Sequence, residues 1–208
     1  GVSSYQLDNP HRGFSFRNDG PLDMRMNPET QITAGKYVNE SSEEELASLL
    51  YNYGDERYSK RVARAIVSMR PITSTKELAN IISDAIPARS KRSPGHPARR
   101  SFQALRIAVN CEIEILESSI REAIRMLKVG GRGIVLSYHS GEDKIIKRIL
   151  RELAGLDISN SKYHPEVRHE KEILLLARKA QRASSEEISR NPRASSALLR
   201  KFEKVSEL

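Results

Sequence analysis

Apolar residues recur three and four positions apart in three successive segments between residues 41 and 87, and this spacing predicts three short amphipathic helices. At the start of the first, Ser41 and Ser42 stand three residues before Glu44 and Glu45, the spacing at which serine and glutamate cap a helix reciprocally. Prolines end the other two segments, because proline cannot continue a helix. We expect the three helices to form one compact module. The first forty residues, rich in Gly, Pro, Asn and Asp, predict ordered loop.

A longer apolar pattern predicts one continuous helix from about Ser101 to Leu127, ended by a pair of glycines. These glycines follow a helix and precede a strand, the reverse of a phosphate-binding loop. The β-branched run over residues 133–138 predicts a strand buried on both faces, which requires parallel neighbours. Ser140, with Asp143 three residues later, is the predicted N-cap of the next helix. Helix, strand and helix in this order indicate an α/β protein.

Few further strands are predicted. The candidates are residues 166–169 and 173–178. The expected sheet therefore has fewer strands than a strand buried on both faces requires as neighbours. The chain after Ala180 is polar and basic, which predicts a loosely attached tail with a final helix around residues 197–205.

Charge and composition narrow the class of protein. Lys and Arg number 35 against 27 Asp and Glu, and the net charge of +8 favours a polyanionic partner. The single cysteine, Cys111, excludes an internal disulfide, and no apolar run approaches the roughly 20 residues of a membrane span. The five histidines show no metal-ligand spacing. We therefore expect a soluble, cytoplasmic protein without a metal. Because the chain opens on Gly1, we also expect a fragment.

The positive charge is concentrated in one segment. Between Ala85 and Cys111 there is no acidic residue. The cations that we expect to contact an RNA backbone there are Arg89, Lys91, Arg92, Arg99 and Arg100. A solvated basic loop without a partner is the alternative.

Two groups of polar residues are candidates for chemistry. The segment from Tyr138 to Asp143 lies where the predicted strand ends and a helix begins, the edge at which open α/β sheets bind ligands. The loops that hold Asp8, Asp19, Asp23 and Arg25 could likewise form the acidic and basic rim of a pocket. A helix cap explains the first group equally well, and turn formation is the default explanation for the second.

The most distinctive stretches, taken in order, resemble the family of bacterial ribosomal RNA small subunit methyltransferase H. They are Gly1-Val2-Ser3-Ser4 with Gln6-Leu7-Asp8, Arg12-Gly13-Phe14-Ser15-Phe16, Asp19-Gly20-Pro21-Leu22-Asp23-Met24-Arg25-Met26, Tyr53-Gly54-Asp55-Glu56, His96-Pro97-Ala98, Phe102-Gln103-Ala104-Leu105-Arg106-Ile107 with Val109-Asn110, and Tyr138-His139-Ser140. The resemblance fades after Gly155 and returns weakly at Asn191-Pro192-Arg193.

The resemblance implies a Rossmann-like, S-adenosylmethionine-dependent methyltransferase with a partial sheet and an inserted helical domain. The implied divisions are residues 1–40 and 99–180 for the methyltransferase domain, 41–98 for the RNA-binding insert and 181–208 for a basic tail. The implied reaction is methylation of N4 of a cytidine in the decoding region of 16S rRNA within the small ribosomal subunit. A homodimer is left open.

The same resemblance suggests roles for individual residues. Gln6 matches a cofactor-contact position. A cytosine amine is a weak nucleophile that needs aligned hydrogen-bond acceptors, and we assign Asp23 as the amine-orienting acceptor and His139 as a pocket-forming residue. Tyr5, Phe14 or Phe16 would stack on the flipped base, although core packing explains the two phenylalanines equally well.

One departure from the family pattern bears on activity. The family's glycine-rich cofactor loop and an aspartate lie upstream of the segment that matches Gly1. We therefore expect the chain as supplied to bind little cofactor and to be inactive by itself. A non-catalytic RNA-binding fragment, or a degenerate paralogue, is the alternative.

Overall fold

The computed structural model describes residues 2–90, 95–156 and 171–207, and it divides the chain into two compact units. The N-terminal unit comprises residues 2–112 and the C-terminal unit residues 113–208. Each unit has its own hydrophobic core. Two predictions concern positions outside the described residues: the strand over residues 166–169, and the RNA contacts of Lys91 and Arg92.

The N-terminal unit is helical. Its elements are α1 (Ser4–Asp8), η1 (Pro10–Arg12), α2 (Ala34–Glu40), α3 (Glu43–Gly54), α4 (Ser59–Ser68), α5 (Thr75–Ala85), η2 (Ala88–Ser90) and α6 (Arg99–Asn110). The three predicted helices are confirmed as α3, α4 and α5. The predicted capping box is also confirmed, because the Ser42 hydroxyl accepts from the Glu45 backbone N–H while the Glu45 carboxylate accepts from Ser42.

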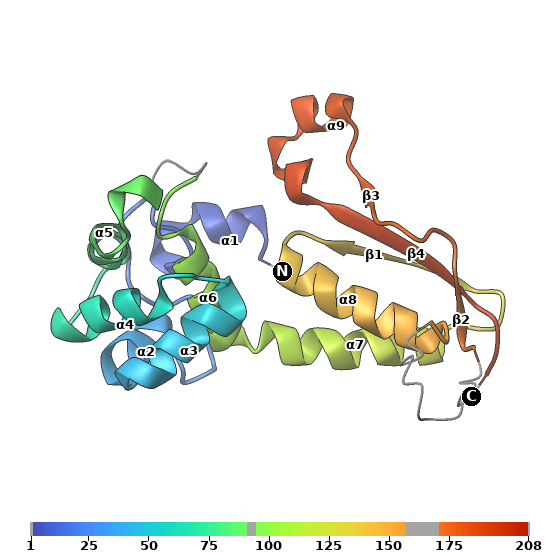
Figure 1. Cartoon of the computed structure of the whole chain (residues 1–208), viewed down its shortest axis with the longest axis horizontal. Coiled ribbons are helices and arrows are strands. Elements are labelled where there is room, and N and C mark those ends of the chain that lie inside the picture. Colours follow the sequence, from blue (N-terminus) through green and yellow to red (C-terminus); the bar gives the residue numbers. More distant parts are fainter. Residues whose placement is uncertain (1, 91–94, 157–170, 208) are drawn as a thin grey trace. The chain divides into compact units, whose positions relative to one another are not determined.

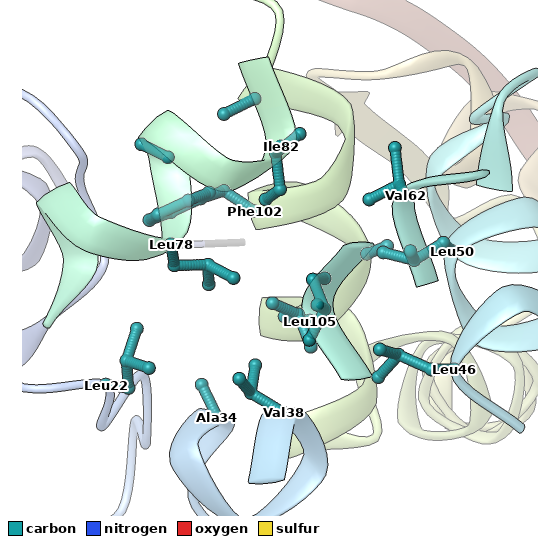
Figure 2. Packing of buried hydrophobic residues seen from close by; sticks show 14 of the residues in the cluster. Leu22, Ala34, Val38, Leu46, Leu50, Val62, Leu78, Ile82, Phe102 and Leu105 are labelled. Carbon is teal, nitrogen blue, oxygen red and sulfur yellow. The ribbon is translucent and has the colours of Figure 1, made fainter. Parts of the chain in front are cut away.

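One core joins the N-terminal loops to these helices. Leu22 from the loop, Leu46 from α3 and Leu105 from α6 are buried together, as Figure 2 shows. The prediction of loop over the first forty residues missed both α1 and α2, and Ala34 and Val38 of α2 are fully buried. The loop before α2 is tightly packed: Gly13 has φ +67°, and a Cβ there would lie 2.1 Å from the Pro21 carbonyl oxygen.

The predicted helix over residues 101–127 is in fact two helices. Cys111 adopts the left-handed conformation (φ 46°) and separates α6 from α7 (Glu112–Met126). Arg106 stabilises the break, since its guanidinium donates to both carboxylate oxygens of Glu112 at 2.7 and 3.1 Å. The apolar spacing continues through Cys111 without a shift, which is why the pattern predicted one helix.

The C-terminal unit holds a small sheet with two helices packed on it (Figure 1). Besides α7, the elements of this unit are β1 (Arg132–Ser137), α8 (Ser140–Leu153), β2 (Ile173–Leu175), β3 (Gln181–Arg182), α9 (Ser185–Arg190), η3 (Pro192–Ser196) and β4 (Leu198–Lys204). The strand order is β1-β4-β2, with β3 also paired to β4, and every pairing is antiparallel. The predicted α/β class is confirmed, and β2 confirms the start of the predicted strand over residues 173–178.

Two predictions for this unit were wrong. Residues 132–137 form a strand that pairs antiparallel with β4 and exposes Ile134 and Leu136, so it is not buried on both faces. Residues 197–205 are not a helix on a loose tail: most of them form β4, which lies between β1 and β2 in the sheet. The Lys204 ammonium is buried and donates to the carbonyls of Arg125 and Leu127, so β4 also caps the end of α7.

Candidate functional site

The loop at Asp23 is the most elaborately bonded polar feature of the N-terminal unit. The Arg25 guanidinium donates from Nε to Asp23 Oδ1 at 2.7 Å and from Nη2 to Oδ2 at 2.8 Å. The Arg25 backbone N–H also donates to Asp23 Oδ1, at 3.0 Å. The remaining guanidinium nitrogen donates to the carbonyls of Pro28 and Thr30. The arginine therefore fixes both the carboxylate and the turn that follows it.

This arrangement keeps Asp23 ionised. The hydrogen bonds from Arg25 hold the pKa of Asp23 below its usual value, against the opposing effect of partial burial. A carboxylate offers about four lone-pair positions, and Arg25 occupies three of them. Asp23 thus presents a fixed anionic acceptor with capacity for about one further donor.

Two further residues fix the backbone of this loop, and the sequence-based assignment did not include them. Asn110, the last residue of α6, donates from Nδ2 to the Met24 carbonyl at 2.8 Å and accepts from the Met26 N–H at 2.6 Å. Arg12 donates to the Arg25 carbonyl at 2.7 Å. Met24 lies between these contacts, fully buried and with φ 60°, a conformation that non-glycine residues rarely adopt. Arg12 and Asn110 both occur in distinctive stretches of the sequence, but nothing in their spacing pairs them with the loop.

Gln6, the candidate cofactor residue, lies in α1. Its Oε1 accepts from the Ser3 N–H at 2.9 Å, and its own backbone N–H donates to the Ser3 hydroxyl. Among the described residues none accepts from its Nε2, so the amide retains donors for a ligand. Tyr5, beside it, is 76% exposed.

His139 is the N-cap of α8 at the end of β1, in the C-terminal unit. Its Nδ1 accepts from the Glu142 N–H at 3.3 Å, and its Nε2 lies 3.4 Å from Glu142 Oε1. Ser140, the predicted N-cap, is instead the first residue of the helix. Burial by itself raises the pKa of Glu142. The His139 side chain and the Tyr138 N–H, which face its carboxylate, outweigh this effect and lower the pKa to about 2. His139 therefore has a structural role at this turn, and its predicted pocket role stays a prediction.

Asp23 and His139 belong to different units, and neither unit by itself brings them together. The basic segment lies in the same unit as Asp23. Arg99 and Arg100 are exposed at the start of α6, and Arg100 donates to the Asp55 carbonyl at 3.2 Å. Arg89 falls in η2.

The three aromatic residues proposed to stack on a base differ in exposure. Phe14 is 5% exposed and belongs to the core, as the alternative for it predicted. Phe16 is partly buried and lies between two other rings, His96 and Phe102. Tyr5 alone of the three is highly exposed.

Within residues 2–90, 95–156 and 171–207, no group of three or more His, Cys, Asp and Glu side chains is placed to hold a metal ion. No helix in those residues is long and apolar enough to cross a bilayer.

The chain combines an α/β unit with a helical unit that carries a fixed carboxylate and exposed arginines. These features define only a broad class of protein, and comparison with known sequences identifies the family. The model of the MraW methylase family matches residues 1–205, and the chain belongs to this family. Membership agrees with the predicted Rossmann-like methyltransferase fold class.

Curated relatives carry a more specific name. Proteins named ribosomal RNA small subunit methyltransferase H match from Halothermothrix orenii (46% identity, 99% of this chain, 67% of the relative), Lactobacillus johnsonii (46%, 99%, 66%) and Acidobacterium capsulatum (49%, 98%, 64%). The chain thus spans about two thirds of the length of the curated relatives it matches.

Proposed function

We propose that this chain is part of an S-adenosylmethionine-dependent methyltransferase acting on N4 of a cytidine in the decoding region of 16S rRNA, within the small ribosomal subunit in the cytoplasm. The family and the names of the relatives support an rRNA methyltransferase. The observation that carries the amine substrate is Asp23, because its ionised carboxylate is held rigidly and keeps room for one donor.

The residues present fit this chemistry in a limited way. The cofactor would supply an electrophilic methyl group on a sulfonium. Gln6 would donate to the cofactor from its uncommitted Nε2. Asp23 would accept a hydrogen bond from the exocyclic amine and orient its lone pair toward the methyl group. His139 would shape the pocket from the end of β1, with Glu142 fixing its ring.

The test uses protein expressed from the complete reading frame. Small subunits from a strain lacking this methylation should gain one N4-methylcytidine, which mass spectrometry of nucleosides distinguishes from the C5-methyl isomer. A product at another base, or none, would refute the proposal. The Asp23→Asn variant should lower kcat about 100-fold with little change in cofactor affinity, the size expected when an aligned group is lost.

A control variant separates this role from loop stability. Asp19 also lies in the loop, where its Oδ1 accepts from the backbone N–H groups of Gly20 and Lys76. The Asp19→Asn variant keeps a carbonyl oxygen that can accept these bonds and should retain near wild-type kcat. Equal losses in both variants would mean that Asp23 matters for folding and not for the amine.

The alternative, a non-catalytic RNA-binding fragment, also has an observation behind it. The N-terminal unit has a core of its own and exposes Arg99 and Arg100. If the complete reading frame encodes no glycine-rich cofactor loop, and the protein binds rRNA fragments without transferring a methyl group, this alternative replaces the enzyme.

A further inference from the structure

Three aromatic rings lie in contact in a row, from a buried residue of the N-terminal unit to an exposed one. Phe102 of α6 is 4% exposed. Phe16 meets it edge to face, with ring centroids 5.2 Å apart and an interplanar angle of 85°. His96 then lies flat on Phe16, at 4.4 Å and 24°. The outermost ring is exposed, so the stack ends at solvent.

The orientation of His96 is fixed by more than this stacking. Its Nδ1 accepts from the Ala98 N–H at 3.2 Å, and its carbonyl accepts from the Arg99 N–H at 3.0 Å, which ties the residue to the start of α6. One ring face lies on Phe16 and Nδ1 points to Ala98. His96 is an exposed residue, and Phe16 stacks on only one face of its ring, so the other face is the one proposed to meet a ligand. An exposed flat ring held this way loses little conformational freedom when something stacks on it.

The surroundings of this ring favour an anionic ligand. Arg99 is exposed, and its Nη1 lies 3.6 Å from the position that a Cβ on Gly95 would take, beside His96 in the chain. Arg100, the next residue in the chain, is also exposed. The whole segment between Ala85 and Cys111 lacks acidic residues. A flat ring next to exposed guanidinium groups is the combination that single-stranded nucleic acids use, with bases on rings and phosphates on cations.

We propose that His96 is a stacking platform for one unpaired base of single-stranded RNA, with Arg99 and Arg100 contacting the neighbouring phosphates. This inference rests on the proposed rRNA function and adds a base-contacting residue to it. The platform is separate from Asp23: it holds a nucleotide of the substrate strand and takes no part in methyl transfer. Stacking tolerates any base, so the platform supplies affinity and position without reading sequence.

The first experiment detects stacking directly. The chain contains no tryptophan, so His96→Trp introduces a single fluorophore on the platform. Adding a short oligocytidylate to the full chain should quench its emission, along a titration curve that matches the fluorescence anisotropy of the labelled oligonucleotide. The control variant is Met69→Trp, which places the fluorophore at the 59%-exposed residue after α4 and should show no quenching. Unchanged emission from Trp at position 96 while the strand binds would overturn the proposal.

The second experiment measures affinity. His96→Ala should weaken oligocytidylate binding about 5- to 150-fold, the value of one stacked base, whereas His96→Phe should bind within about twofold of wild type. Because the ring contributes stacking, His96→Ala should leave the slope of log affinity against log salt unchanged. Arg99→Gln with Arg100→Gln should make that slope shallower by about 1.4, the contribution of two phosphates on a single strand. Circular dichroism of each variant excludes unfolding.

The outcomes separate the platform from the function on which it rests. If wild type binds the strand and the double arginine variant binds it more weakly, but His96→Ala binds like wild type, the platform is refuted and RNA binding stands. If wild type binds neither oligocytidylate nor 16S fragments, both the platform and the RNA substrate are refuted. A methyltransferase assay on small subunits then reports on the enzyme independently.

Discussion

Asn110, the last residue of α6, is predicted to be critical for the stability of the Asp23 loop. Replacing it with alanine removes the partner of the Met24 carbonyl, at 2.8 Å, and of the Met26 N–H, at 2.6 Å. Each buried backbone group left without a partner costs about 1–3 kcal/mol. Because the site is only half-buried, water will reach part of it, and the helix gains about 0.5 kcal/mol from alanine. We expect Asn110→Ala to lower the free energy of unfolding by about 2 kcal/mol.

Urea unfolding followed by far-UV circular dichroism measures this loss as a lower midpoint at unchanged slope. The matched control is Asn52→Ala in α3, where the amide contacts only the exposed Ser48 hydroxyl and the change should stay within about 0.5 kcal/mol. Asn110→Asp tests the two bonds separately, because it keeps the acceptor for Met26 and sets a carboxylate against the Met24 carbonyl; it should destabilise at least as much as alanine. Midpoints for both Asn110 variants equal to that of the control would refute the reasoning.

Three further predictions concern packing and ionisation. Lys204→Met leaves two carbonyls at the end of α7 unpaired and should lower the midpoint of unfolding, whereas Lys201→Met, on the same strand and only half-buried, should not. Gly13→Ala should destabilise the N-terminal unit by at least about 1–2 kcal/mol in urea titrations, because φ is positive and the Pro21 carbonyl is in the way. The pKa of Glu142 is lowered to about 2 from 4.5, so its contribution is present above pH 4.5 and is lost as the pH falls toward 2; Glu142→Gln should flatten the loss of stability that acid titration of the C-terminal unit shows over that range.

The helices that could be predicted from the sequence are those whose signals are local. The capping box at Ser42 and the apolar spacing of α3 depend only on neighbours within one or two turns, and both are confirmed. The break at Cys111 was missed because the polar contacts that hold it leave the apolar spacing unchanged. Arg106 pairs with Glu112, and Asn110 with the Met24 loop, and no periodicity in the sequence contains those contacts.

The strands show the same limit. Residues 198–204 place Leu198, Arg200, Phe202 and Lys204 two apart, the strand period, but the same stretch also fits a helical spacing of four. The pairing of β4 with β1 on one side and with β2 on the other makes this stretch a strand. The paired residues of β1 and β4 are more than sixty positions apart in the sequence. Arg200 adds a contact that the sequence does not predict, a two-pronged ion pair with Asp143 of α8.

Around the candidate site, contacts between residues close in sequence can be predicted, and contacts with distant residues cannot. Asp23 and Arg25 are two residues apart and could be paired from the sequence, whereas Arg12 and Asn110 reach the loop from elsewhere in the chain. The sequence indicates His96 only as part of a distinctive stretch, because its stacking on Phe16 joins segments eighty residues apart. A conformation that depends on such distant contacts has no signature in spacing or composition.

Part of the net charge of +8 is committed within the fold, because Arg70 and Lys204 donate to backbone carbonyls. Arg70 donates to the carbonyls of Val38 and Ser41 near the end of α2, and Lys204 to those of Arg125 and Leu127 at the end of α7. Arg99 and Arg100 differ from these in being exposed at the start of a helix, where the backbone N–H groups also attract anions. Arg99 and Arg100 therefore add electrostatic attraction for a phosphate backbone close to His96 in the chain, and neutralising them should weaken RNA binding.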